Sequence, residues 1–119
     1  MNNLEVLEYI LSLDANFSSV WNSDDNYNRE DDGSATICGV LTEFGQYLQD
    51  HTQLDSLTYL KEFFEFLEVH SDDNTELGGA IRVCFLEGLA FTPAGKSLEH
   101  YMGKRCRHYM SGGTFQWST

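Results

Sequence analysis

The stretch that decides the fold is DNTELGGAIRVCFLEGL, residues 73–89. Its apolar side chains fall at nearly every angle of a helical wheel, so a helix here has almost no polar face. Such a helix is stable only when neighbouring elements cover most of its sides. Asp73 and Glu76 form a D-x-x-E variant of the capping box that begins a helix. We therefore expect a helix from about residue 73 to residue 89 at the centre of the core.

Helical periodicity continues on both sides of this stretch. Apolar residues recur at helical spacing in four longer segments and one short turn, which are residues 3–13, 17–21, 35–50, 56–70 and 93–110. In the first segment the apolar stripe is Leu4, Leu7 and Leu11. The candidate N-caps are Asn2 or Asn3, Ser34, Asp55, and Thr92 followed by Pro93 as the first helical residue.

The segments between and after these helices are polar. Residues 22–34 indicate an acidic loop, and residues 111–119 indicate a short irregular tail with Phe115 and Trp117 as candidate anchors. The helices are joined by short connections, which is typical of a helical bundle. The sequence thus predicts one all-α domain, residues 1–119. It would hold about five helices in an antiparallel bundle or a short stack of helix pairs, with the hydrophobic fourth helix at its centre.

Charge is distributed unevenly along the chain, whose net charge is -12. Residues 1–95 carry 18 acidic and three basic side chains, whereas residues 96–119 carry one acidic and four basic side chains. A strongly negative surface repels nucleic acid and anionic membranes, because both are polyanions. The expected partner is therefore a basic macromolecule, with no direct contact to nucleic acid or to a membrane.

One side of the helix predicted at residues 56–70 is acidic. Opposite its leucine-rich core face lie Asp55, Glu62, Glu65, Glu68 and Asp72, which we call the acidic stripe. Lys61 alone interrupts its negative charge. Tyr59 and Phe66 sit beside the stripe, and aromatic residues beside charge are typical of interface hot spots. The pattern fits either a solvated face flanked by residues that a neighbouring helix covers, or a binding surface for a basic partner.

The acidic loop offers a second group of carboxylates, at Asp24, Asp25, Asp31 and Asp32. It lacks the glycine and the final glutamate of an EF-hand, so a calcium site is not indicated. A loop that steers a cationic partner is the more consistent interpretation. The candidate partner-binding residues are thus Glu62, Glu65, Glu68, Asp72, Tyr59, Phe66, Asp24, Asp25, Asp31 and Asp32.

Catalytic and metal-binding patterns are missing from the sequence. The histidines and cysteines do not stand at the spacings of a zinc site, and the glycines form no phosphate-binding loop. We therefore expect no enzyme activity, no cofactor and no metal. Three widely spaced cysteines are no disulfide framework, and no secretory signal is present. These features predict reduced thiols and a cytoplasmic protein.

The segment FFEFLEVHSDDNTELGGAIRVCFLEGL, residues 63–89, resembles small acidic helical immunity proteins of bacterial contact-dependent growth inhibition and related polymorphic toxin systems. The shared pattern is an aromatic-Leu-Glu run, an acidic break, and a buried helix that ends in Cys-Phe-Leu-Glu. This resemblance implies a protein that binds and neutralises a cognate toxin stoichiometrically. The implied toxin is a basic ribonuclease or another nuclease, because a nuclease must hold a phosphate backbone.

Two other binding functions stay open. A nucleic-acid mimic that inhibits DNA-binding enzymes needs carboxylate pairs along an extended surface, and the basic segment 96–119 counts against it. An acidic adaptor module that binds a basic protein is compatible with the composition. The neighbouring gene distinguishes these functions, since an immunity protein is expected beside a gene for a toxin.

Overall fold

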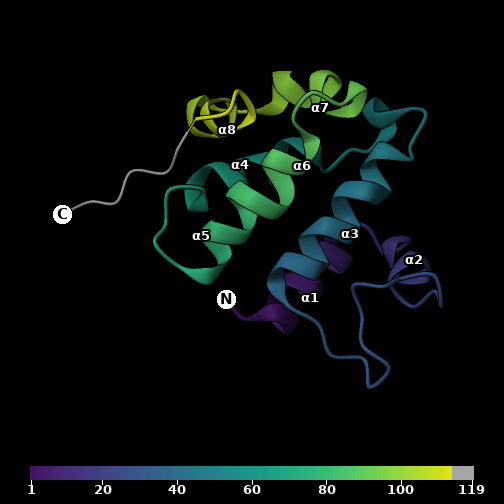
Figure 1. Cartoon of the computed structure of the whole chain (residues 1–119). Coiled ribbons are helices and arrows are strands. Elements are labelled where there is room, and N and C mark those ends of the chain that lie inside the picture. The colour runs from purple at the N-terminus through teal and green to yellow at the C-terminus, as the bar shows by residue number, and fades with distance from the viewer. Residues whose placement is uncertain (114–119) are drawn as a thin grey trace.

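The computed structural model describes residues 1–113, and the candidate tail anchors Phe115 and Trp117 lie outside them. Every regular element within residues 1–113 is helical, which confirms the all-α prediction. The main helices are α1 (Asn3–Leu13), α2 (Phe17–Trp21), α3 (Ile37–Gln49), α4 (Leu60–His70), α5 (Glu76–Ala80), α6 (Glu87–Leu89), α7 (Pro93–Leu98) and α8 (Lys104–Met110). Figure 1 places α7 and α8 along the upper edge of the molecule, and α1 on its lower side.

The hydrophobic stretch forms one central run, as predicted. α5 continues into a π-helical segment, η2 (Ile81–Leu86), and then into α6. The ring of Phe85, which is 1% exposed, lies 5.5 Å from the ring of Phe63 and 6.2 Å from that of Phe64. The run is nevertheless open on one side, since Val83 is 60% exposed.

The helix starts show which caps the sequence identified correctly. α1 has the predicted bounds, and Asn2 and Glu5 form a reciprocal capping box. Elsewhere a threonine nearer to the helix provides the cap. Thr75 rather than Asp73 accepts the first-turn N–H of α5, and Thr36 rather than Ser34 accepts that of α3. Asp73 instead lies 2.9 Å from the ring of His70.

The predicted apolar stripe of α1 is only partly correct, since Leu7 and Leu11 pack against the core at its edge, and the predicted start of α4 is wrong. In α1 the fully buried residues are Val6 and Ile10, while Leu4 is 57% exposed, because the helix turns a different side to the core. α4 begins at Leu60 instead of residue 56, and no side chain caps it. The preceding residues form a separate 3₁₀ turn, η1 (Leu54–Ser56), which ends where Leu57 takes an extended backbone conformation.

The helix predicted at residues 93–110 is divided. Thr92 and Pro93 begin α7 as predicted, and Thr92 Oγ1 accepts the Gly95 N–H at 2.9 Å. A 3₁₀ turn, η3 (Glu99–Tyr101), follows, and the chain starts a new helix, α8, after Gly103. A Cβ atom at Gly103 would lie 2.6 Å from the carboxylate of Glu68, so a larger residue here would displace that carboxylate from the start of α8.

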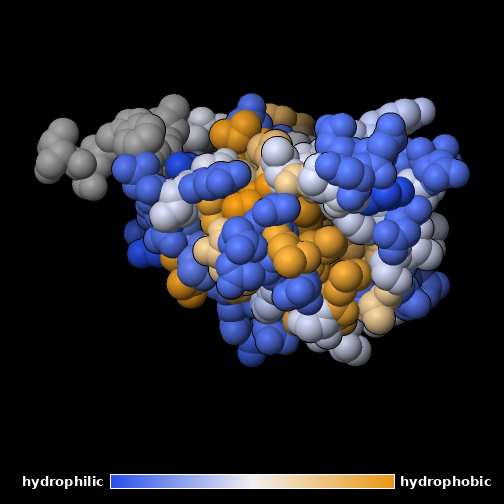
Figure 2. Space-filling model, turned by 90° about the horizontal axis from the view of Figure 1, so that it is seen from below, coloured by the Kyte–Doolittle hydropathy of each residue, from blue (hydrophilic) through white to orange (hydrophobic). Residues whose placement is uncertain are grey.

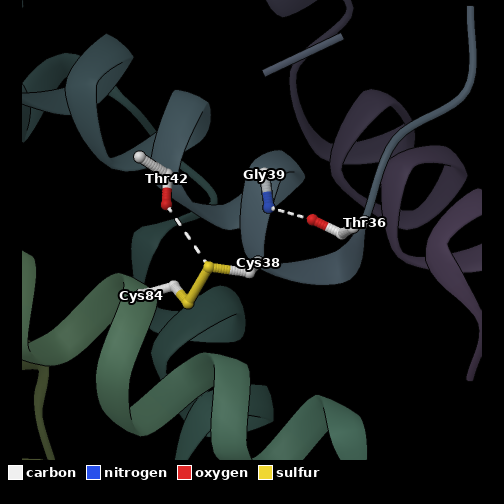
Figure 3. Close-up of a disulfide and its surroundings, with 5 residues drawn as sticks. All are labelled: Thr36, Cys38, Gly39, Thr42 and Cys84. Atoms are coloured by element: carbon white, nitrogen blue, oxygen red, sulfur yellow. Dashed lines mark hydrogen bonds between the residues drawn. A yellow bond between two sulfur atoms is a disulfide. The ribbon is translucent and has the colours of Figure 1, made fainter. Parts of the chain in front are cut away.

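A disulfide joins Cys38 to Cys84, which corrects the prediction that all three thiols are reduced. The two cysteines are 46 residues apart, but the packing of α3 on η2 brings their Cα atoms to 5.4 Å. Figure 3 shows Cys38 in the first turn of α3, where its sulfur also lies 3.9 Å from Thr42 Oγ1. Cys106 is free and buried. Sequence spacing could not reveal the pair, because the distance depends on how two helices pack.

No single helix in the described range is long and apolar enough to cross a membrane. Only a bent pair, Glu76–Leu89 with Pro93–Tyr101, reaches the required length and composition, and its halves turn by 111°. Apolar side chains of this pair, Ile81, Phe85 and Leu98 among them, are buried in the core.

Candidate protein-binding surface

α4 presents two opposite faces. Its core face is fully buried and consists of Leu60, Phe63, Phe64 and Leu67, each 0% exposed. Helical spacing therefore turns Glu62 and Glu65 outward, and both are exposed. In the part of the chain that the structure describes, neither carboxylate forms an ion pair or a hydrogen bond. These two predicted residues lie where a partner can reach them.

α1 runs antiparallel to α4 and supplies an aromatic neighbour. Asp14 at the end of α1 meets Tyr59 at the start of α4, and Tyr9 in the middle of α1 contacts Phe66 further along α4. The centroids of the Tyr9 and Phe66 rings are 4.5 Å apart. Burial and the negative charge of Glu62 raise the pKa of Tyr9, and Glu62 lies one helical turn before Phe66 on α4.

These residues make up what we call the α1–α4 surface. Helical spacing puts Val69 on the same side of α4 as Glu62 and Phe66, and Val69 is 62% exposed. The surface consists of Tyr9, Glu62, Glu65, Phe66 and Val69. Figure 2 views the molecule from the lower side, where α1 lies, and shows an apolar area surrounded by polar side chains. The molecule thus carries one exposed and two partly buried apolar side chains close to uncompensated carboxylates.

Tyr59, unlike Phe66, is bound to another residue of the fold through its hydroxyl. Its hydroxyl donates to Asp14 Oδ2 at 2.8 Å, and the hydroxyl of Tyr47 donates to the same oxygen at 3.0 Å. Asp14 is only 7% exposed, and its other oxygen accepts the backbone N–H of Asn16 at 3.1 Å, so three donors satisfy the carboxylate. Burial, together with the Asp14 carboxylate, raises the pKa of Tyr47 to about 12, and the same two causes raise the pKa of Tyr59. The Tyr59 hydroxyl is therefore engaged within the fold.

Glu68 and Asp72 face the basic end of the chain. Glu68 accepts hydrogen bonds from the backbone N–H groups of Arg105 and Cys106, at 2.8 and 3.0 Å. Asp72 lies 3.2 Å from Arg105 Nε and accepts a short hydrogen bond from the hydroxyl of Tyr109. The acidic stripe is thereby divided. Glu68 and Asp72 hold α8, and Asp55 accepts a hydrogen bond of 3.2 Å from the Tyr101 hydroxyl, whereas Glu62 and Glu65 are open.

The acidic loop forms a separate surface. Asp24, Asp25, Asp31 and Asp32 are all exposed. The loop packs back on α2, since Arg29 Nε donates to the Trp21 carbonyl at 2.9 Å. Hydrogen bonds from Ser34 lower the pKa of Asp32. Figure 1 places the loop beyond α2 and away from α4, so the structure does not bring the loop acids together with Glu62 and Glu65.

Sequence reasoning missed Tyr9, Val69 and the Asp14 acceptor. Tyr9 lies outside the Leu4, Leu7 and Leu11 stripe, and an aromatic residue off the apolar stripe was the available signal. The same signal singled out Phe66 on α4. The pairing of Tyr47 and Tyr59 at Asp14 joins three segments distant in sequence, so only the fold reveals it.

Metal ligands and reactive thiols are the other groups that could carry chemistry. Within residues 1–113 no three His, Cys, Asp or Glu side chains are grouped so as to hold a metal ion. The free thiol, Cys106, is 0% exposed, and burial with the nearby Glu68 raises its pKa to about 12. A thiol with such a pKa stays protonated and is a poor nucleophile at neutral pH.

A family model described as a domain of unknown function, DUF7674, matches residues 7–118. No curated protein and no solved structure matches the chain. The matched range includes every residue of the α1–α4 surface and both residues of the disulfide.

Proposed function

The chain belongs to the DUF7674 family, and we propose that it is a binding module that takes a basic partner protein on its α1–α4 surface. The observation that carries this proposal is the pair of exposed carboxylates, Glu62 and Glu65, beside the Tyr9–Phe66 ring contact. On the other half of α4, the acids are bound to α8. The unbound pair is therefore available for an external cation.

The two components of the surface support different parts of binding. Carboxylates at an interface steer a cationic partner and raise its association rate. Aromatic side chains supply the apolar contact that slows dissociation, and hot spots are enriched in tyrosine. Tyr9 and Phe66 are partly buried against each other, so they lose little conformational freedom when a partner binds.

We further propose that the module is an immunity protein for a basic nuclease toxin. The supporting features are the net charge of -12 and the resemblance of residues 63–89, a segment that begins in α4 and ends in α6. Carboxylates presented to a nuclease take the place of substrate phosphates. Neutralisation then needs only stoichiometric binding, with no catalytic group in this chain.

The proposal places the protein in the cytoplasm, where a nuclease toxin finds its substrate. Thiol reductants there keep most protein disulfides open. The Cys38–Cys84 bond of the structure therefore has to form in spite of these reductants, or the fold has to hold without it. The remaining core is intact in that case, because Cys38 is exposed and Cys84 only partly buried.

The test uses the purified product of the adjacent gene. If it is a basic nuclease, titration with this protein should abolish nucleic-acid cleavage at one equivalent, and co-expression should restore growth. Inhibition that needs a large excess of this protein contradicts stoichiometric neutralisation. So does a nuclease that stays inactive after excess nucleic acid has displaced this protein from it. An adjacent product that is neither basic nor bound removes the immunity assignment.

A further inference from the structure

Phe91 occupies a backbone conformation that favours glycine. It lies in the turn between α6 and α7, which is closed by the Thr92 N–H donating to the Leu89 carbonyl at 3.1 Å. Ala90 has φ −56° and ψ 135°, and Phe91 has φ 66°. These are the angles of a type II turn, whose third residue is usually glycine because φ is positive there. A phenylalanine here adopts a disfavoured backbone conformation.

Burial of the Phe91 side chain does not offset this backbone strain, since the side chain is 94% exposed. Neither the turn nor the packing of residues 1–113 therefore favours phenylalanine at this position. Strained backbone often marks a functional position, and a fully exposed aromatic ring marks an interaction site when other apolar surface adjoins it.

Such a surface adjoins Phe91 on both sides. A pocket of about 680 Å³ lies on one side, with Pro93 and Met110 as apolar walls. Its charged rim consists of Lys96, Glu99 and Arg107. A second hollow, of about 610 Å³, lies on the other side of the ring. The ring thus projects between two hollows on one face, which we call the Phe91 face.

A face that carries both a projecting ring and a pocket is complementary to the same face of a second copy, because each ring can enter the pocket of the other chain. A two-fold axis through the Phe91 face brings each ring to the pocket of the other chain, and the pocket rim carries both signs of charge, as a self-complementary contact requires. We propose that two copies associate through the Phe91 face, with each Phe91 seated in the pocket of the other.

Charge favours this face over the remainder of the surface. Two copies with a net charge of -12 each repel one another at long range. The first pocket of the Phe91 face is formed in large part by residues 96–111, from the segment where bases outnumber acids. Two copies therefore approach with least repulsion here. Figure 1 places α7 and α8 at the edge opposite α1, so such a dimer leaves α1 on the far side of each copy.

The test is the oligomeric state of the purified full chain, measured by sedimentation over a concentration series. Phe91→Gly removes the ring and suits the positive φ, so it should weaken association by about 30-fold or more without lowering the melting temperature. Tyr27→Gly is the matched control. Tyr27 is 92% exposed in the acidic loop, and its loss should leave association unchanged.

Two results overturn the proposal. One is a wild-type protein that stays monomeric up to about 1 mM, which leaves the face to a different partner. The other is a Phe91→Gly protein that dimerises as tightly as the wild type. If Phe91→Gly melts at a lower temperature, Phe91→Asn carries the same test, because asparagine also tolerates a positive φ.

Discussion

Glu68 and Arg105 are joined at the start of α8, where Glu68 Oε2 accepts a hydrogen bond of 2.8 Å from the backbone N–H of Arg105. The carboxylate therefore caps a helix whose own N-cap, Gly103, has no side chain to do so. A negative charge at this position also favours the helix dipole. This contact explains why the basic end of an acidic chain folds onto α4.

Removing this cap should destabilise the protein. Glu68→Ala loses both N–H contacts to α8, and we expect a loss of about 1–2 kcal/mol in the free energy of unfolding. Glu65→Ala, on the exposed side of the same helix, is the control and should stay within about 0.5 kcal/mol. Urea unfolding of the two variants decides the point. Equal midpoints would show that Glu68 is only a surface acid.

The disulfide should stabilise the fold by restricting the unfolded chain. It closes a long loop, with a sequence separation of 46 residues, and such bonds contribute about 2–4 kcal/mol. Adding a thiol reductant to the wild type should lower the unfolding midpoint, and Cys38→Ser with Cys84→Ser should reproduce the lower value. The double variant should not respond to reductant. A wild-type midpoint that reductant leaves unchanged contradicts a structural bond.

The tyrosine pair at Asp14 predicts a loss of stability at high pH. The pKa of Tyr47 is raised from 10.0 to about 12 in the fold, so the folded protein holds this proton more tightly than the unfolded chain does. Its contribution is complete below pH 10 and is lost as the pH rises toward 12. The free energy of unfolding, measured against pH, should fall less steeply over this range in Tyr47→Phe than in the wild type. Parallel curves for the two proteins would contradict the prediction.

The core prediction is tested at Phe85. Phe85→Ala leaves a cavity beside Phe63 and Phe64 and should cost about 3–5 kcal/mol of stability. Val83→Ala, two residues earlier and 60% exposed, is the control with an expected change below about 0.5 kcal/mol. Thermal melts distinguish the two. A Phe85→Ala protein that melts with the control would mean that the central run is not the core.

The fold class and the central helix could be predicted from sequence, because apolar periodicity is a local signal. The start of α1 at its Asn2 cap and the start of α7 at Thr92 and Pro93 were equally local. The break before α8 could not be predicted from local sequence, since it arises from Glu68, which lies on another helix. The disulfide and the Asp14 acceptor likewise depend on contacts between distant segments.

The candidate site was predicted in part for the same reason. Spacing along α4 identified Glu62, Glu65 and Phe66 as outward or flanking residues. It could not distinguish them from Glu68 and Asp72, because the difference lies in where α8 packs. A sequence shows which face of a helix is polar, but not which part of that face another element of the chain occupies.

The measurement that tests the central claim most directly compares two charge reversals of equal size. Glu62→Lys with Glu65→Lys changes the α1–α4 surface, and Asp24→Lys with Asp31→Lys makes the same change of charge on the acidic loop. Association with the basic adjacent-gene product is followed against salt for both variants and the wild type. The α4 variant should bind far more weakly, because like charges then meet at the contact, and its association rate should lose most of its salt dependence. The loop variant should show only a modest decrease in rate. Equal effects of the two variants, or wild-type affinity in the α4 variant, would contradict the α1–α4 surface as the binding site.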